Sequence, residues 1–179
     1  PDSPMGTLSG LSMVPYFREG RRILGRSAYG QAAFMIREND LRRNFPEQRN
    51  FSATSVGISH YAIDIHGCRY RNWHPSGDAV SAPAQEPAVR PLQIPLESLI
   101  PQGVDNLLMG GKSIAVTHIA NASTRVHYGE WQIGAAAGVT AAWLSASGAP
   151  VARPGDVIPQ GHMGSLQQFM GQQGLRLSP

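Results

Sequence analysis

The pattern most typical of a helix lies toward the C-terminal end of the chain, over residues 130–147. The segment EWQIGAAAGVTAAWLSAS is rich in Ala, ends before Gly148 and is followed by Pro150, as is common where helices end. Gly134 and Gly138 are four residues apart in this segment and therefore share one face. We expect this face of small residues to pack closely against another backbone. A last short helix is expected over residues 163–173, with Gly174 as its C-cap.

Shorter patterns predict strands and turns ahead of that helix. Residues 54–66 alternate at Ile58, Tyr61, Ile63 and Ile65, which is typical of a half-buried strand. Residues 91–94 are expected to form a second short strand, and residues 96–100 a single helical turn. The apolar run at residues 106–109 ends in Gly110-Gly111, which predicts a buried parallel strand that ends in a glycine turn.

The remaining chain predicts short elements joined by irregular segments. It contains 20 Gly and 14 Pro in 179 residues, a usage typical of turns rather than long helices. Residues 30–44 are expected to hold a short helix or strand, residues 1–12 a loose lead-in, and residues 74–91 a Pro-rich surface loop. The length suits one domain or a large piece of one. The predicted class is α/β, in the sense of a mixed α+β chain.

Charge and composition narrow the classes of partner. Fifteen basic residues face 12 acidic ones, and Lys112 is the only lysine. The arginines form short clusters rather than the long basic stripe that nucleic-acid binding requires, and no run of about 18 apolar residues is long enough to span a membrane. The single cysteine, Cys68, excludes an internal disulfide. The compartment stays open between a reduced cytoplasm, slightly favoured, and a disulfide-free secreted protein.

One candidate cluster is His60, Asp64 and His66. On a strand these positions share a face, and two His with a carboxylate are suitable metal ligands. The spacing matches no strong zinc motif. A small metal-dependent hydrolase therefore stays one alternative, and an ordinary polar face of a half-buried strand stays the other.

A second candidate site lies between the glycine turn and the helix at residues 130–147. Glycines let a backbone approach a ligand, and a helix start presents free N–H groups to an anionic atom. The connection between the two elements is dense in polar residues, and three of its side chains could act as acid or base: His118, His127 and Tyr128.

The segment DNLLMGGKSIAVTHIANASTRVHYGEWQIGAAAGVTAAWL (105–144) resembles the C-terminal signature of the FAD-dependent oxidoreductase family. Four further segments resemble that family in the same order. They are REGRRILG (18–25), SVGISHYAIDIHG (55–67), PLQIPLESLIPQGVDNLL (91–108) and LQQFMGQQGLRL (166–177).

The resemblance implies a fold, a cofactor and a set of roles. The chain would be the C-terminal part of an FAD-binding fold, with a substrate-facing region over residues 13–104, the last strand and helix of the FAD domain over 105–148, and a closing segment over 149–179. A small organic substrate would be oxidised by hydride transfer to flavin. The resemblance implies contacts along the ribityl and isoalloxazine end of the flavin from Gly110, Gly111, Lys112 and Ser113. It implies that Arg125 and the N–H groups from Val126 to Gly129 lie at the pyrimidine edge. The implied acid–base groups are His118, His127 or Tyr128.

The sequence also departs from the family pattern. Lys112 stands where the family has Arg, Ser113 where it has Cys, and residues 127–130 replace a Met-Pro-Thr-Cys stretch. No Gly-x-Gly-x-x-Gly occurs anywhere in the chain, although a bound dinucleotide needs such a turn for its pyrophosphate. Together with the start at Pro1, this predicts that a second chain or a missing N-terminal segment carries that turn. A non-catalytic binding or assembly module that retains the fold is a further alternative.

Overall fold

The computed structural model describes residues 34–43, 47–63 and 89–179. Its helices are α1 (Glu38–Leu41), α2 (His118–Thr124), α3 (His127–Ser145) and α4 (Met163–Gln172), and its strands are β1 (Ser55–Ser59) and β2 (Leu92–Pro95). Four short 3-10 turns connect them: η1 (Ser52–Thr54), η5 (Leu96–Leu99), η6 (Gly111–Ser113) and η7 (Pro154–Asp156). This confirms a mixed α+β chain. No helix in the described ranges is long and apolar enough to cross a membrane.

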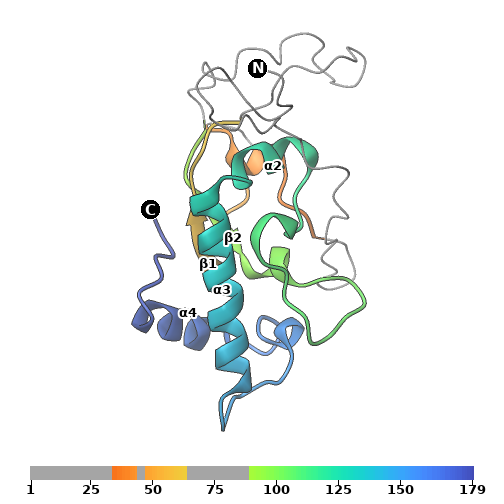
Figure 1. Cartoon of the computed structure of the whole chain (residues 1–179), viewed down its shortest axis with the longest axis vertical. Helices are drawn as coiled ribbons and strands as arrows, with labels where there is room; N and C mark the ends of the chain where they lie inside the picture. Colours follow the sequence, from red (N-terminus) through yellow and green to blue (C-terminus); the bar gives the residue numbers. More distant parts are fainter. Residues whose placement is uncertain (1–33, 44–46, 64–88) are drawn as a thin grey trace, which may run out of the picture.

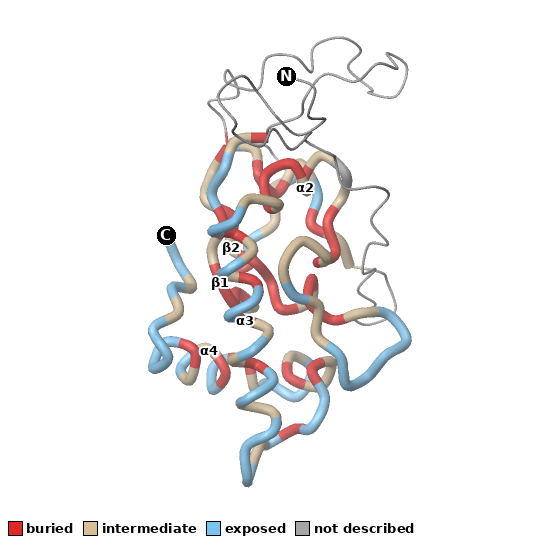
Figure 2. Tube along the Cα trace, in the orientation of Figure 1, coloured by how far each residue is buried: buried red, intermediate tan, exposed pale blue. Residues whose placement is uncertain are grey.

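The two strands and the long helix form the centre of the molecule. β1 and β2 pair antiparallel, with Gly57 opposite Ile94 and an irregularity between Ser55 and Gly57. α3 crosses this pair, and α4 packs against both α3 and β1 (Figure 1). The buried residues gather where these layers meet (Figure 2). The largest fully buried side chains include Val56, Leu92, Ile94, Leu96, Leu99, Ile133 and Leu166.

The long helix packs through one face only. Its buried positions are Gly129, Ile133, Ala136 and Thr140, a spacing of three to four residues that follows the helical period. The Thr140 hydroxyl donates a 2.7 Å hydrogen bond to the Ala136 carbonyl, which satisfies the polar atom buried among these apolar ones. α3 confirms the predicted helix and begins three residues earlier than residue 130.

The predicted packing of the glycine face of α3 is wrong for the described chain. Gly134 and Gly138 are both exposed, and a Cβ added to either would meet no atom within 4 Å. The reason lies in the phase of the helix, because Ile133 and Ala136 are the positions directed at β1 and the core.

The predicted strand at residues 106–109 is also wrong. Asn106 lies in a turn and Leu107 is 46% exposed. Parallel pairing occurs instead between Ile36 and Val116, where the Ile36 N–H donates to Ala115 at 2.9 Å and the Thr117 N–H donates to Ile36 at 2.8 Å. The run at 114–116 is equally apolar and fully buried, so it takes the interior position.

Several other predicted elements form, and one of the predicted strands is shorter than expected. β2, the turn η5 and α4 form as predicted, and Gly174 adopts the positive φ of a helix C-cap at 81°. The strand expected over residues 54–66 ends at Ser59, and its residues 64–66 lie outside the described part. The expected short helix or strand at 30–44 contains α1, with bridge residues on either side. Of the predicted loop at 74–91, Val89 is buried and bridges Arg42.

Candidate functional site

The glycine turn lies beside the first half of α3. Gly110 and Gly111 lead into η6, which contacts α3, and a Cβ added to Gly110 would stand 3.9 Å from the Gly134 Cα. Gly111 has a positive φ of 61° with open space at its Cβ position, so a flat group can approach this backbone without meeting a side chain. The Ser113 N–H closes the turn on the Gly110 carbonyl at 3.4 Å.

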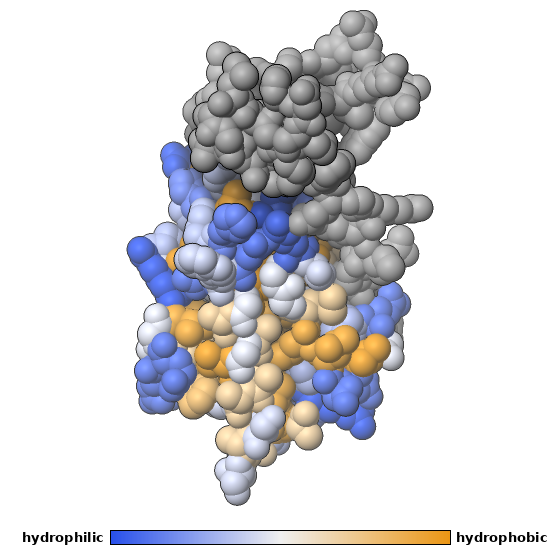
Figure 3. Space-filling view, viewed as in Figure 1, coloured by the Kyte–Doolittle hydropathy of each residue, from blue (hydrophilic) through white to orange (hydrophobic). Residues whose placement is uncertain are grey.

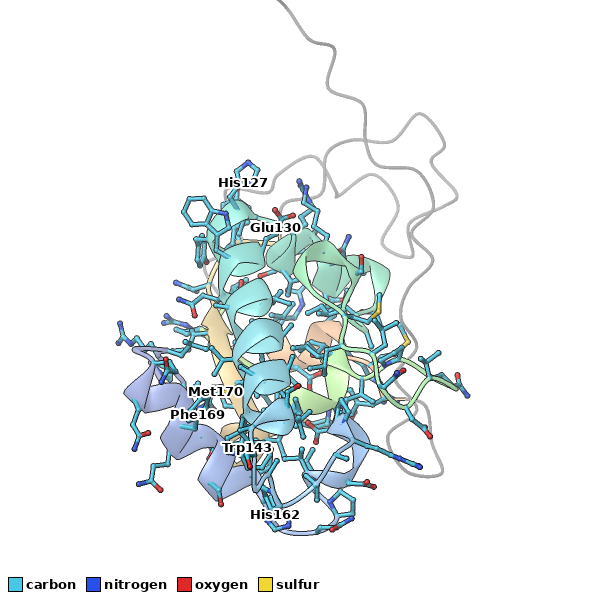
Figure 4. All side chains as sticks on the ribbon, turned by 60° about the horizontal axis from the view of Figure 1, so that its bottom comes forward. His127, Glu130, Trp143, His162, Phe169 and Met170 are labelled. Atoms are coloured by element: carbon cyan, nitrogen blue, oxygen red, sulfur yellow. The ribbon has the colours of Figure 1, made fainter. Side chains whose placement is uncertain are left out.

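The side chain of Glu130 joins this turn to the start of α3. The Lys112 Nζ lies 3.0 Å from Glu130 Oε1, and the His127 Nδ1 lies 3.4 Å from Glu130 Oε2. Figure 4 shows His127 and Glu130 at the same end of the helix. The Glu130 side chain is 18% exposed and that of His127 is 86% exposed. A lysine, a carboxylate and a histidine therefore meet at one helix end.

The junction of α2 and α3 supplies the other predicted contacts. Arg125 caps the C-terminus of α2, and its N–H donates to the Asn121 carbonyl at 3.1 Å. Val126 is the N-cap of α3 and accepts from the Glu130 N–H at 2.9 Å. The N–H groups of the first turn have no partner within the helix, and this end carries the positive pole of the helix dipole. These backbone groups favour a negatively charged ligand edge, and Lys112 lies nearby in its ion pair with Glu130.

Gly129 fixes how closely this helix start approaches the sheet. A Cβ at Gly129 would stand 2.8 Å from Ser59 Oγ and 3.1 Å from the Thr124 carbonyl oxygen. Ser59 itself is 1% exposed at the end of β1. The resemblance implies that the Gly129 N–H faces a ligand, and the packing gives this glycine a structural role as well.

Tyr128 connects α3 to the segment that follows β1. Its hydroxyl accepts a 2.5 Å hydrogen bond from the His60 N–H. Burial raises the pKa of the Tyr128 hydroxyl above its ordinary value, and the hydrogen bond from the backbone N–H of His60 partly offsets that rise. At neutral pH the group is therefore a neutral phenol that can donate a proton.

Two predicted groups are only partly described. His118 begins α2, and its side chain lies outside the described part, so its acid–base role stays a prediction. Asp64 and His66 also lie outside, whereas His60 is described and exposed. No group of three His, Cys, Asp or Glu side chains in the described ranges is arranged to hold a metal ion.

Glu130 is the residue that the sequence reasoning missed. It follows His127 by three residues, the spacing that brings two side chains onto one face of a helix, and this spacing could have identified the pair. Its contact with Lys112 joins segments separated in the sequence, so no local pattern could have indicated it.

A comparison with protein families places the whole site within one family match. The model of a family described as FAD dependent oxidoreductase matches residues 2–154, a range that includes every predicted site residue. No curated protein and no solved structure matches the chain.

Proposed function

Because the chain belongs to the FAD dependent oxidoreductase family, we propose that it forms the flavin-facing part of such an enzyme and takes part in oxidising a small organic substrate. The bound flavin would supply the redox chemistry by accepting a hydride. The family assignment supports the coarse class of reaction. The oxidation of a small organic substrate, the transfer of a hydride to the flavin, and the contacts between named residues and the flavin are what we propose.

The observation that carries the proposal is the meeting of η6 with the start of α3. The glycine turn exposes backbone without side chains, and the neighbouring Lys112 forms an ion pair with Glu130. The junction at Arg125 and Val126 leads into the N-terminus of the 19-residue helix α3, which carries the positive pole of its dipole. These features suit the flavin ring at the turn and its pyrimidine edge at the helix start, where negative charge gathers on reduction.

The chain's own residues would orient the groups around that edge. Arg125 and Lys112 would stabilise negative charge, with Glu130 holding Lys112 in place. His127 is exposed beside Glu130, so it can reach a substrate proton. Tyr128, held by the His60 N–H, can donate one. His118 remains a third acid–base candidate by resemblance.

The proposal includes a second component. A dinucleotide requires a Gly-rich turn at a helix N-terminus to hold its pyrophosphate, and no two glycines in this sequence are separated by a single residue. A part with that turn, on another chain or in a segment joined to this one, would complete the FAD site.

Arg125→Ala tests the proposed contact with the flavin. In the flavin-loaded protein, loss of this cation should lower the flavin reduction potential or the flavin content, because negative charge on the reduced ring loses its partner. Arg153→Ala is the matched control, since Arg153 pairs with Asp105 on an exposed surface at 3.0 Å. If both variants keep the potential and flavin content of the parent, Arg125 does not contact the cofactor.

A further inference from the structure

A buried hydroxyl group without a hydrogen-bond partner lies at the end of β1. Ser59 is 1% exposed, and its Oγ meets no hydrogen-bond partner among the residues that the structure describes. Ser55, at the other end of the same strand, is equally buried but donates to the Leu177 carbonyl at 2.6 Å. Buried polar atoms in native proteins are almost always paired, so the unpaired hydroxyl of Ser59 needs a physical explanation.

The Ser59 hydroxyl lies against the start of α3. A Cβ added to Gly129 would stand 2.8 Å from Ser59 Oγ, so no side chain separates this oxygen from the helix backbone there. Tyr128 precedes Gly129 in the first turn of α3, and its hydroxyl accepts the hydrogen bond from the N–H of His60, the residue after Ser59. Two neighbouring residues at the end of β1 thus supply a backbone N–H and a hydroxyl group beside Tyr128.

These two groups act on the acidity of the phenol in the same direction. Burial raises the pKa of the Tyr128 hydroxyl, whereas the His60 N–H and the nearby Ser59 hydroxyl lower it, and the neighbouring phenol of Tyr61 raises it. A hydrogen bond donated to an oxygen stabilises its charged form. While the phenol is neutral, the Ser59 hydroxyl makes no hydrogen bond, so it is a second donor that becomes useful only when Tyr128 loses its proton.

The segment that carries the two donors is fixed by both neighbouring helices. Ser123 of α2, itself 1% exposed, donates a 2.5 Å hydrogen bond to the Tyr61 carbonyl, and Tyr128 of α3 accepts the 2.5 Å hydrogen bond from His60. Residues 60 and 61 are therefore tied to the end of α2 and to the start of α3. Donors held in place by packed elements stabilise a developing charge without a costly rearrangement.

The ring of Tyr128 is also accessible from outside. Tyr128 is 41% exposed, and Figure 3 shows hydrophilic residues at the surface around the end where α3 begins, whereas apolar residues gather over the middle of the molecule. The other acid–base candidate with a described side chain, His127, is 86% exposed, so water surrounds most of its ring. Of the two, Tyr128 is therefore the group whose proton-carrying atom lies between a fixed donor and a buried hydroxyl.

We propose that Tyr128 passes its proton to an anionic oxygen of the substrate and that Ser59 is its positioning residue, an inference that rests on the proposed function. The O–H bond of Tyr128 breaks as the proton bonds to the substrate oxygen, and the negative charge of that oxygen passes to the phenol oxygen. The His60 N–H and the Ser59 O–H, rotated toward Tyr128, then hold this charge with two hydrogen bonds. When a proton returns from water, the phenol is neutral again and Ser59 is again without a partner.

The ionisation of residue 128 tests this proposal in the complete 179-residue chain, without flavin. Replacing Tyr128 with a fluorinated tyrosine makes this phenol more acidic than the others, so it ionises while the protein is folded, and the ultraviolet absorbance of its phenolate reports on that residue alone. Ser59→Ala removes the second donor and should shift the titration to higher pH. Ser55→Ala removes an equally buried hydroxyl from the other end of β1 and is the matched control, which should titrate like the parent.

The outcomes separate a positioning role from a structural one. If Ser59→Ala titrates like the parent, the proposal is wrong, and equal shifts in Ser59→Ala and Ser55→Ala overturn it as well, because a general loosening of β1 would then explain both. Circular dichroism at each pH checks that the variants keep their helices. The titration needs no cofactor, so a shift confined to Ser59→Ala in a protein that proves unable to hold flavin would support the donor role of Ser59 while contradicting the proposed function.

Discussion

At the scale of single residues, an ion pair between a buried carboxylate and a partly exposed guanidinium stabilises the segment before β1. Asp40, 1% exposed, accepts hydrogen bonds from the Arg49 guanidinium at 2.9 and 2.5 Å and from the Arg37 N–H at 2.7 Å. The Arg49 guanidinium also lies 4.9 and 5.0 Å from the ring centres of Phe34 and Phe51. A charged side chain held between two rings and a carboxylate fixes this irregular segment where regular secondary structure is sparse.

Removing the charge of Asp40 should destabilise the fold. Asp40→Asn leaves the Arg49 cation without its carboxylate partner, and we expect a loss of about 2 kcal/mol in the free energy of unfolding. This is less than for a fully buried pair because the Arg49 side chain is 36% exposed. Asp105→Asn, which removes an exposed partner of Arg153, should change stability by about 0.5 kcal/mol or less. Urea unfolding of both variants makes the comparison, and equal effects would show that the Asp40–Arg49 pair contributes no more to stability than an exposed ion pair.

Glu97 predicts a pH dependence of stability. Burial raises the pKa of its carboxyl above the ordinary value of 4.5, and hydrogen bonds to its own backbone and to Thr54, then the charge of Arg49, partly offset the rise. The folded state therefore binds this proton more tightly than the unfolded state. The contribution to stability is complete below about pH 4.5 and is lost as pH rises through the raised folded-state pKa.

Glu97→Gln removes this ionisation. We expect the variant to gain stability relative to the parent as the pH rises from 4 to 7, because the parent alone must ionise a desolvated carboxyl. Denaturant unfolding at several pH values measures the difference between the two proteins. A difference that stays constant across that range would mean that Glu97 ionises equally easily in both states.

At the scale of elements, α3 shows how one helix treats its glycines differently. Gly129 faces Ser59 and the Thr124 carbonyl with no room for a Cβ, whereas Gly138 faces open space. The sequence predicted the helix and the shared face of Gly134 and Gly138, yet it gave no means to decide which side of the helix meets the sheet. That choice depends on the phase of Ile133 and Ala136 against β1, which is a property of the packed structure.

Substitutions at these two glycines should therefore have opposite effects. Gly129→Ala should destabilise the protein by about 1–3 kcal/mol, because the added methyl group collides with atoms of β1 and α2. Gly138→Ala should stabilise it by up to about 1 kcal/mol, since alanine favours the helix and meets no neighbour. Thermal unfolding of the pair provides the measurement. A destabilising Gly138→Ala would show that another part of the protein covers Gly138 in solution.

The elements that the sequence predicted well are those with local signals. β2 and η5 are bounded by prolines, and α4 ends at a glycine with positive φ. The strand expected at residues 106–109 failed because two apolar runs compete for the interior. The run at 114–116 pairs with Ile36, a contact across about 80 residues of sequence that no window of residues can reveal.

At the scale of the whole molecule, the proposed function makes the candidate site one half of a cofactor-binding arrangement. The glycine turn and the helix start could be identified from the sequence, because backbone exposure and helix capping leave local patterns. The link through Glu130 could not, since it depends on how η6 and α3 pack.

We propose that this chain faces the flavin but needs a glycine-rich partner to hold FAD. Isothermal titration of FAD into the complete 179-residue chain, alone and with the glycine-rich half of an intact family member, tests it most directly. We predict little or no binding to the chain alone, and stoichiometric binding to the two parts together that is tighter than to the glycine-rich half by itself. Tight stoichiometric binding of FAD to the chain alone would contradict the need for a partner. If adding the chain leaves the affinity of the glycine-rich half for FAD unchanged, the chain does not contact the flavin.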